Sequence, residues 1–170
     1  YRRAEIDALD RYEGRGVYYW ASPVEAKLCK DEHAMLVGGG NSAGQAAVYL
    51  ASHAAEVHML VRGEGLEATM SRYLIDRIRG LSNVHLHTHS QITAMEGEGW
   101  LSTVRYKERA QGPECIAVPM RHVFLFIGAA PNTEWLRSCH VETDAKGFIL
   151  TGYEAHHSCT ERADYTLETS

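Results

Sequence analysis

The sequence has 170 residues, of which 45 % are hydrophobic and 23 % charged, and its formal net charge is −5. That length suits one ordinary globular core, and no apolar run approaches the roughly 18 residues that a membrane helix needs, so we expect no membrane partner. The acidic balance argues against a nucleic-acid partner, because nucleic-acid binders gather Lys and Arg to replace the counterions of the phosphates.

The cysteines favour a reducing compartment. Four of them are widely spaced and form no C-x-x-C pair: Cys29, Cys115, Cys139 and Cys159. With no signal peptide, this spacing favours a cytoplasmic protein with free thiols over a disulfide scaffold. The sequence does not begin with Met, and its last ten residues carry no evident stop signal. We therefore expect both ends to be cuts within a longer protein.

The predicted elements begin with an entering strand at 16–20 and a short helix around 24–29. A wholly apolar stretch at 34–37 follows and ends in three glycines, which is typical of a central parallel strand covered on both faces. From Ser42 onward small residues recur at helix spacing. Their size would let this helix lie close against a sheet.

The remaining pattern predicts further strands and one more helix. A strand, an amphipathic helix and a strand complete a β-α-β-α-β unit at 57–61, 70–78 and 84–88. Three stretches with no helix between them predict an antiparallel meander at 92–96, 100–106 and 115–119. The apolar run 123–127 predicts a return to the main sheet. This order predicts an α/β, Rossmann-like three-layer domain with a central parallel sheet, flanking helices and a three-stranded antiparallel β-meander.

A glycine-rich turn joins the first predicted buried strand to the helix after it. It has the form G-x-G-x-x-A and consists of Gly38, Gly39, Gly40, Asn41, Ser42 and Ala43. The pyrophosphate of a dinucleotide would sit here, because Gly38 permits the tight turn, Gly40 admits the phosphates and Ala43 keeps the helix close. Asn41 or Ser42 can cap the helix, whose free N–H groups would face the diphosphate. The alternative is a turn that only connects strand to helix.

Arg62 stands at the end of the second buried strand. An NAD-specific site would usually place Asp or Glu there, against the ribose hydroxyls. A guanidinium can instead pair with a 2′-phosphate, so NADP(H) is favoured over NAD(H). The alternative is a solvated surface arginine.

The whole chain resembles the NADPH domain of low-molecular-weight thioredoxin reductases, and especially the thioredoxin-reductase-like proteins fused to an N-terminal regulatory domain. The sequence similarity lies in five stretches: Tyr12–Val17, Val37–Ala47, Met70–Leu74, Phe124–Thr133 and Gly147–Gly152. The fourth stretch is similar to the family's strand that ends in Gly-x-x-Pro near the bound nicotinamide nucleotide. The resemblance therefore implies that Ile127 and Gly128 lie beside the cofactor.

In that family the cofactor-binding domain is inserted into an FAD domain. The resemblance thus implies an entering segment at 1–30, an NAD(P)H-binding domain at 31–150 and an exit segment at 151–170, with the FAD site in the missing parts of the protein. The intact enzyme would pass a hydride from NADPH to FAD, and then onward to thioredoxin or another redox protein. The family tends to form homodimers. We expect the isolated fragment to be inactive and to need no catalytic side chain of its own.

One departure from the family concerns the redox dithiol. The family's C-x-x-C, just beyond the residues that match Gly16-Val17, is replaced here by Trp20-Ala21-Ser22-Pro23. Cys29 alone cannot replace a pair, because disulfide exchange needs a second, resolving thiol, and we interpret it as a half-buried helix residue. The missing dithiol leaves a second hypothesis, a non-catalytic nucleotide-sensing or regulatory module of the same fold.

Another departure lies in the family's phosphate-binding cluster HRRxxxR. It becomes Val61-Arg62-Gly63, with Glu67 in the place of the final Arg. Only one cation of the cluster remains, and Glu67 would repel a 2′-phosphate if it came near.

Three histidines, His85, His87 and His89, alternate along the predicted strand at 84–88 and suggest a metal site. Val84 and Leu86 would already supply the buried face of that strand. The histidines are therefore expected to point to solvent or toward a covering element, and we predict no metal site.

A second group, His156, His157 and Cys159, lies in a polar tail. It lacks a fourth ligand at any recognisable spacing, so we expect these side chains at the surface.

Overall fold

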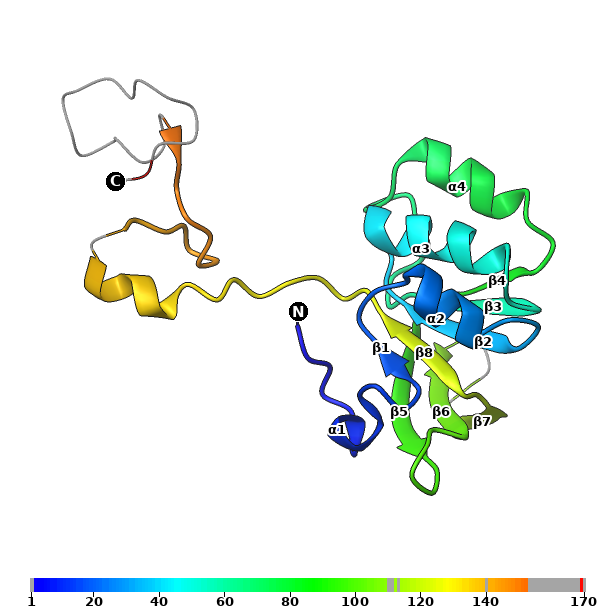
Figure 1. Cartoon of the computed structure of the whole chain (residues 1–170). Coiled ribbons are helices and arrows are strands. Elements are labelled where there is room, and N and C mark those ends of the chain that lie inside the picture. Colours follow the sequence, from blue (N-terminus) through cyan, green and yellow to red (C-terminus); the bar gives the residue numbers. More distant parts are fainter. Residues whose placement is uncertain (1, 110–111, 113, 140, 153–168, 170) are drawn as a thin grey trace. The chain divides into compact units, whose positions relative to one another are not determined.

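The computed structural model describes residues 2–109, 112, 114–139, 141–152 and 169. It divides into two compact units, one from Arg3 to Ile127 and one that begins at Gly128. The first unit contains two sheets and the helices that flank them (Figure 1). The predicted histidine group at 156–159 lies outside the described residues.

The main sheet of the first unit has five parallel strands in the order β1-β8-β2-β3-β4. Their bounds are β1 (Val17–Tyr18), β8 (His122–Leu125), β2 (His33–Val37), β3 (Glu56–Leu60) and β4 (Val84–His87). The central strands read as short apolar runs because both of their faces are covered. In β2 the three residues after His33 are all buried.

A second, antiparallel sheet has the order β5-β6-β7. Its strands are β5 (Ser90–Glu96), β6 (Thr103–Glu108) and β7 (Ile116–Pro119). The middle strand begins three residues later than the sequence pattern predicts, because Trp100 is exposed in the turn after β5. The predicted meander is otherwise confirmed.

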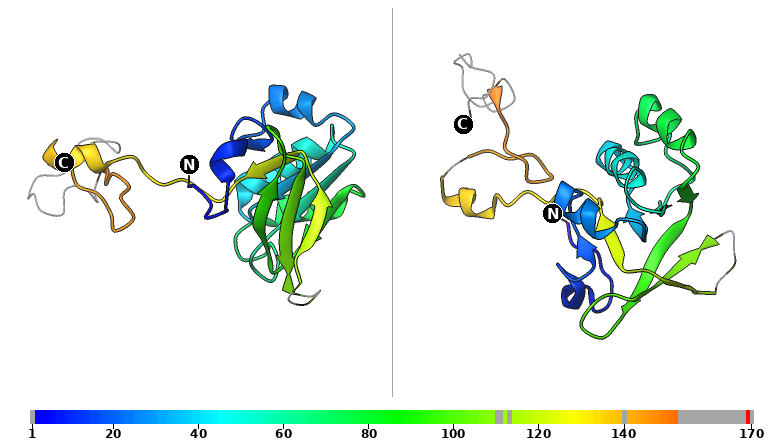
Figure 2. Two further views of the ribbon diagram at one scale, coloured as in Figure 1. Left: turned by 90° about the horizontal axis from the view of Figure 1, so that it is seen from below. Right: turned by 45° about the vertical axis from the view of Figure 1, so that its right-hand side comes forward.

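The two sheets and the helices form three layers (Figure 2). The helices α2 (Pro23–Leu28), α3 (Asn41–Ala51) and α4 (Arg72–Arg79) lie on one face of the main sheet, and the antiparallel sheet covers the other. A four-residue helix, α1 (Leu9–Tyr12), packs into the core on the antiparallel side, with Tyr12 buried. This arrangement confirms the predicted α/β class with a central parallel sheet, flanking helices and a meander.

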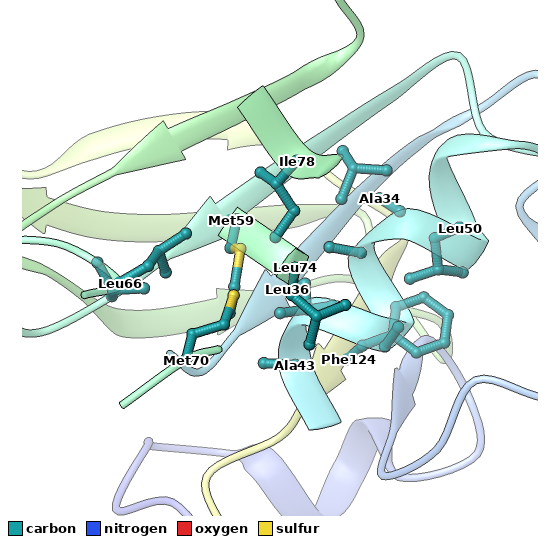
Figure 3. Packing of buried hydrophobic residues seen from close by; sticks show 14 of the residues in the cluster. Ala34, Leu36, Ala43, Leu50, Met59, Leu66, Met70, Leu74, Ile78 and Phe124 are labelled. Atoms are coloured by element: carbon teal, nitrogen blue, oxygen red, sulfur yellow. The ribbon is translucent and has the colours of Figure 1, made fainter. Parts of the chain in front are cut away.

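Small residues let α3 lie close to the sheet. Ala43 and Ala47 are fully buried, and Leu50 completes the same face (Figure 3). On the side toward α4, a Cβ on Gly44 would stand 2.8 Å from Met70 Sδ. The close packing holds the amino end of α3 at a defined place against the sheet.

The edge strand β4 differs from the expectation. Leu86, which was expected to be buried, is 42 % exposed, whereas the side chain of His87 is only 18 % exposed. Val84 packs against the core as predicted, and the side chain of His85 is 42 % exposed, so the prediction of burial fails at Leu86. The antiparallel sheet is the covering element on the histidine side, where Tyr106 of β6 packs edge-on against the His87 ring.

The described residues of the second unit include a short 3-10 helix, η2 (Glu134–Cys139), which the sequence pattern did not predict. Farther along this unit, Thr143 and Ile149 form an antiparallel bridge. Among the residues that the structure describes, no helix has the length and apolarity required to cross a membrane.

Candidate functional site: the glycine-rich turn

The glycine-rich turn lies at the carboxyl edge of the main sheet. It leaves β2 at Val37 and enters α3 at Asn41. The amide of Gly38 donates to the Leu60 carbonyl of β3 (3.1 Å), and the amide of Phe126, which follows β8, donates to the Val37 carbonyl (2.8 Å). The chain continues from β2 to β3 on one side, whereas β8 returns on the other. Ligands of open α/β sheets bind at such a switch point, outside the carboxyl ends of the strands.

Gly38 has the backbone that only glycine adopts readily. Its φ is +145°, and a Cβ there would stand 2.4 Å from the Phe126 carbonyl oxygen and 3.2 Å from the Ala43 Cβ. Ala43 itself is fully buried. These contacts explain why the first and last positions of the motif are small.

Gly40 is different, because its surroundings are open. Its φ of −89° suits any residue, yet a Cβ on Gly40 would meet no atom within 4 Å. Gly40 is the residue that precedes α3, and no side chain caps this end of the helix. The first amides of a helix have no partner within it, so the turn presents N–H donors and the positive end of the helix dipole at an open surface.

The expectation that Asn41 or Ser42 caps the helix is wrong. Asn41 is already the first helical residue, and its Oδ1 accepts a hydrogen bond from the Ser71 amide before α4 (2.7 Å). The Gly39 carbonyl likewise accepts from Thr69 Oγ1 (2.7 Å). The segment before α4 therefore stabilises the turn from outside. Sequence reasoning missed both contacts, and only the polar character of the segment 69–71 hinted at them.

Arg62 is exposed just beyond β3, next to the buried Val61. Within the described part of the chain its guanidinium has no hydrogen bond or ion pair. Glu67 is engaged, because its Oε1 lies 2.5 Å from Arg79 Nη2 and its Oε2 accepts from the Leu66 amide (3.0 Å). Backbone amides, its own first, and Arg79 lower the pKa of Glu67. Arg79, which sequence reasoning missed, thus offsets the negative charge that was expected to repel a 2′-phosphate.

The other two predicted site residues fall at the boundary between the units. Ile127 ends the first unit and directly follows Phe126, whose carbonyl lies beside Gly38. Gly128 begins the second unit and has a φ of +98°, a left-handed value that favours glycine. The structure thus brings the turn from Gly38 to Ala43, Arg62 and Ile127 to one edge of the first unit, and Gly128 belongs to the other unit.

The residues 20–23, where the resemblance implies the family's dithiol, lead into the start of α2. Ser22 caps this helix in a capping box with Glu25, and Pro23 occupies its first turn. Burial alone would raise the pKa of Glu25, but hydrogen bonds from Ser22 and the Trp20 indole outweigh it and lower that pKa. The segment is built as a helix start.

Cys29 follows α2 and is fully buried, more completely than the half-buried residue expected. Burial, with smaller contributions from Glu32 and Glu25, raises the pKa of its thiol to about 12. A thiolate is the reactive form in disulfide exchange, so Cys29 is an inert packing residue at neutral pH.

Comparison with known proteins gives consistent matches along most of the chain. The family model of the pyridine nucleotide-disulphide oxidoreductases matches residues 2–160. Thioredoxin reductase of Mycoplasma genitalium is 31 % identical over 149 residues, which are 88 % of this chain and 46 % of that protein. Thioredoxin reductase of Mycoplasma pneumoniae is 29 % identical over 157 residues, 92 % of this chain and 49 % of that protein.

Solved structures agree with this match. The crystal structure of thioredoxin reductase from Streptococcus pyogenes superimposes with a TM-score of 0.75 at 26 % identity and covers 91 % of this chain and 49 % of that one. Thioredoxin reductase from Lactococcus lactis has the same fold, with a TM-score of 0.79 at 24 % identity over 89 % and 48 % of the two chains. The chain thus spans less than half the length of these relatives.

Proposed function

Since this chain belongs to the pyridine nucleotide-disulphide oxidoreductase family, we propose that it is the NADP(H)-binding part of a thioredoxin reductase-like flavoprotein. The observation that carries the proposal is the open space at Gly40, in front of an uncapped helix start. A diphosphate placed there meets free amides and the positive end of the helix dipole. The turn therefore fits a nicotinamide dinucleotide.

The residues of the turn would bind and orient the nucleotide. Gly38 and Ala43 keep α3 close to β2, and the amides after Gly40 hold the diphosphate. Arg62, exposed and without a partner in the described part of the chain, pairs with the 2′-phosphate. Ile127 and Gly128 border the nicotinamide end. Bound NADPH supplies a hydride, which an FAD held by another part of the protein accepts, and the protein contributes positioning rather than a catalytic side chain.

The electron acceptor after the flavin is a disulfide of thioredoxin or another redox protein. This step needs thiols from elsewhere in the protein, because the place of the family's dithiol is the capped start of α2 and Cys29 is buried with a raised pKa. The same observation supports a second candidate, a nucleotide-sensing or regulatory module. Flavin reduction in the whole protein distinguishes the two, since only the enzyme bleaches its flavin absorbance when NADPH is added.

The nucleotide proposal is tested by calorimetric titration of the 170-residue chain with NADPH, NADH and FAD. We expect NADPH to bind, NADH to bind about tenfold more weakly, as the loss of one charge-assisted contact implies, and FAD not to bind. Arg62→Ala should narrow the gap between NADPH and NADH. Arg105→Ala is a control for the loss of one positive charge, taken from β6 of the other sheet, where Arg105 pairs with Glu96. Equal affinities in the parent chain would overturn the role of Arg62, and absence of nucleotide binding would overturn the function.

A further inference from the structure

A cluster of histidines lies along β2, β3 and β4 and begins at the amino ends of β2 and β3, opposite the glycine-rich turn. His33 and Glu56 begin β2 and β3 and are paired in register, and His58 pairs with His85 of β4. The His58 ring is central, with ring centroids of His33, His85 and His87 at 6.0, 5.3 and 5.4 Å. These four histidines and Glu56 are called the histidine cluster below.

Glu56 is the meeting point of the cluster. Its Oε2 lies 3.3 Å from His33 Nδ1 and 3.4 Å from His58 Nε2, and its Oε1 lies 3.8 Å from His85 Nε2. The first two distances exceed the usual 2.9 Å or so of an N–H···O hydrogen bond. They match the edge of about 3.3 Å that a tetrahedron has around a zinc ion with ligands at its usual bond lengths.

The hydrogen bonds behind His58 are satisfied by one tautomer of its ring. The Glu108 carboxylate only accepts, so His87 Nδ1, 3.2 Å away, must donate to it. A neutral His87 then offers Nε2 as an acceptor, and His58 Nδ1, at 3.2 Å, donates to that atom. The Nε2 atom of a neutral His58 therefore directs a lone pair at Glu56 Oε2, which is itself an acceptor.

In this tautomer two acceptors face each other, and a positive charge between them relieves their repulsion. A metal ion can supply that charge, because imidazole nitrogens and carboxylate oxygens are ordinary ligands of zinc and related ions. The chain from Glu108 through His87 is the outer support that metal-bound histidines usually have.

We propose that His33, Glu56 and His58 bind one divalent transition-metal ion of the zinc class, with the fourth position open to water. One donor atom of each residue lies within 4.8 Å of the donors of the other two. A cavity of about 580 Å³ borders all three side chains and gives the ion a path from solvent. No metal site was predicted from the sequence, because His85, His87 and His89 were considered by themselves. Sequence spacing does not reveal that the pairing of β2 with β3 brings His33 and Glu56 to His58.

The metal site is separate from the proposed nucleotide site. β2 and β3 both run from the histidine cluster toward the carboxyl edge, where Gly38 and Arg62 lie. Five residues of an extended strand span roughly 15 Å. Binding of metal and of nucleotide should therefore be independent, and loss of one should leave the other.

The test uses the metal-free 170-residue chain, titrated with Zn²⁺ by calorimetry and with Co²⁺ by visible absorption. We expect one ion per chain and the intense d–d bands of four-coordinate Co²⁺. Glu108→Gln, which changes the outer support, should weaken Zn²⁺ binding about 10- to 100-fold. His58→Gln, Glu56→Gln and His33→Asn each remove a ligand and should weaken it at least as much. If His58→Gln does not fold, His33→Asn decides, because the His33 side chain is 54 % exposed.

Two controls make the assignment specific. His53→Gln changes a histidine at the end of α3, outside the cluster, and should leave Zn²⁺ affinity unchanged. The double variant His156→Gln, His157→Gln removes the other histidine group of the sequence and should also leave it unchanged. Absence of stoichiometric binding in the parent chain, or full binding in the Glu56 and His33 variants, would overturn the proposal. NADPH titration of the same variants reports on the nucleotide site separately.

Discussion

Gly38 and Gly40 lie two residues apart in one turn, but different neighbours constrain them. Gly38 needs a positive φ, and the Phe126 carbonyl occupies the place where its side chain would be. Gly40 has an ordinary backbone and open space around it. The first glycine therefore serves the fold, whereas the second leaves room for a ligand.

This difference predicts that the same substitution affects stability at Gly38 and nucleotide binding at Gly40. Gly38→Ala should lower the free energy of unfolding by about 1–3 kcal/mol, because a strained backbone and a clash coincide. Gly40→Ala should leave stability within about 0.5 kcal/mol and weaken NADPH binding about tenfold, since the new methyl group separates the diphosphate from the amides. Thermal melts and calorimetry measure the two effects. A Gly40→Ala chain that binds NADPH as the parent does would contradict this placement of the diphosphate.

The spacing of the turn was sufficient to predict its position from the sequence. Its supports were not predictable, because Asn41 and Gly39 are held by Ser71 and Thr69, which lie 30 residues farther along the chain. The same holds for the histidine cluster, in which His33 and His58 meet only through the pairing of two strands. Contacts within one element follow from local pattern, whereas contacts between elements follow from topology.

At the scale of elements, the buried strands and the helices with an apolar face were predicted to within a few residues. The apolar run before the glycines became β2, and the small-residue helix became α3. The short α1 and η2 were not predicted, since four or six residues show little helical period, although the equally short α2 was predicted. In β4 the predicted burial holds for Val84 but not for Leu86, which is exposed, and the second sheet covers His87 on the opposite face.

The start of α2 allows a test of capping with a matched control. Ser22→Ala removes the cap and one hydrogen-bond donor to the buried Glu25, so we expect the free energy of unfolding to fall by about 1–2 kcal/mol. Ser71→Ala changes the residue before α4, whose side chain makes no capping bond, and should cost less than about 0.5 kcal/mol. Urea unfolding measures the free energy of unfolding of both variants. An equal decrease in the two would show that the cap on α2 does not stabilise the fold.

For the whole molecule, the order of predicted elements was enough to predict the class of fold, because a β-α-β-α-β unit admits few arrangements. The meander as the third layer was also predicted, and both faces of the main sheet carry a buried cluster. The break between the units at Ile127 was not visible in the sequence, since 123–127 and the glycine after it read as one continuous stretch.

The stability of the first unit should depend on pH through His122. This buried histidine has its Nε2 3.0 Å from Glu32, which also pairs with Arg121, and its ring stacks on Tyr18. Its Nδ1 is buried and has no partner among the described residues. Burial lowers the pKa of His122, and this effect exceeds the opposite one of Glu32.

The direction follows from proton binding. The unfolded chain takes up the proton near pH 6.5, whereas the folded chain does so only at lower pH, so stability is retained above that value and falls as the pH decreases below it. We expect His122→Gln to show a shallower decline in unfolding free energy between pH 7 and pH 5. The measurement is urea unfolding with a chelator present, so that metal binding at Glu56 does not add its own pH dependence to the unfolding free energy. A variant that declines as steeply as the parent would contradict the assignment.

Val61, the first residue after β3, is buried, and the three residues that follow it are exposed. A substitution at these positions leaves the interior packing unchanged, whereas a side chain at Gly38 would clash with the Phe126 carbonyl. Under the proposed function, a lineage of such proteins could therefore exchange one reducing coenzyme for another by surface changes alone, while its hold on the shared diphosphate would depend on the integrity of the fold.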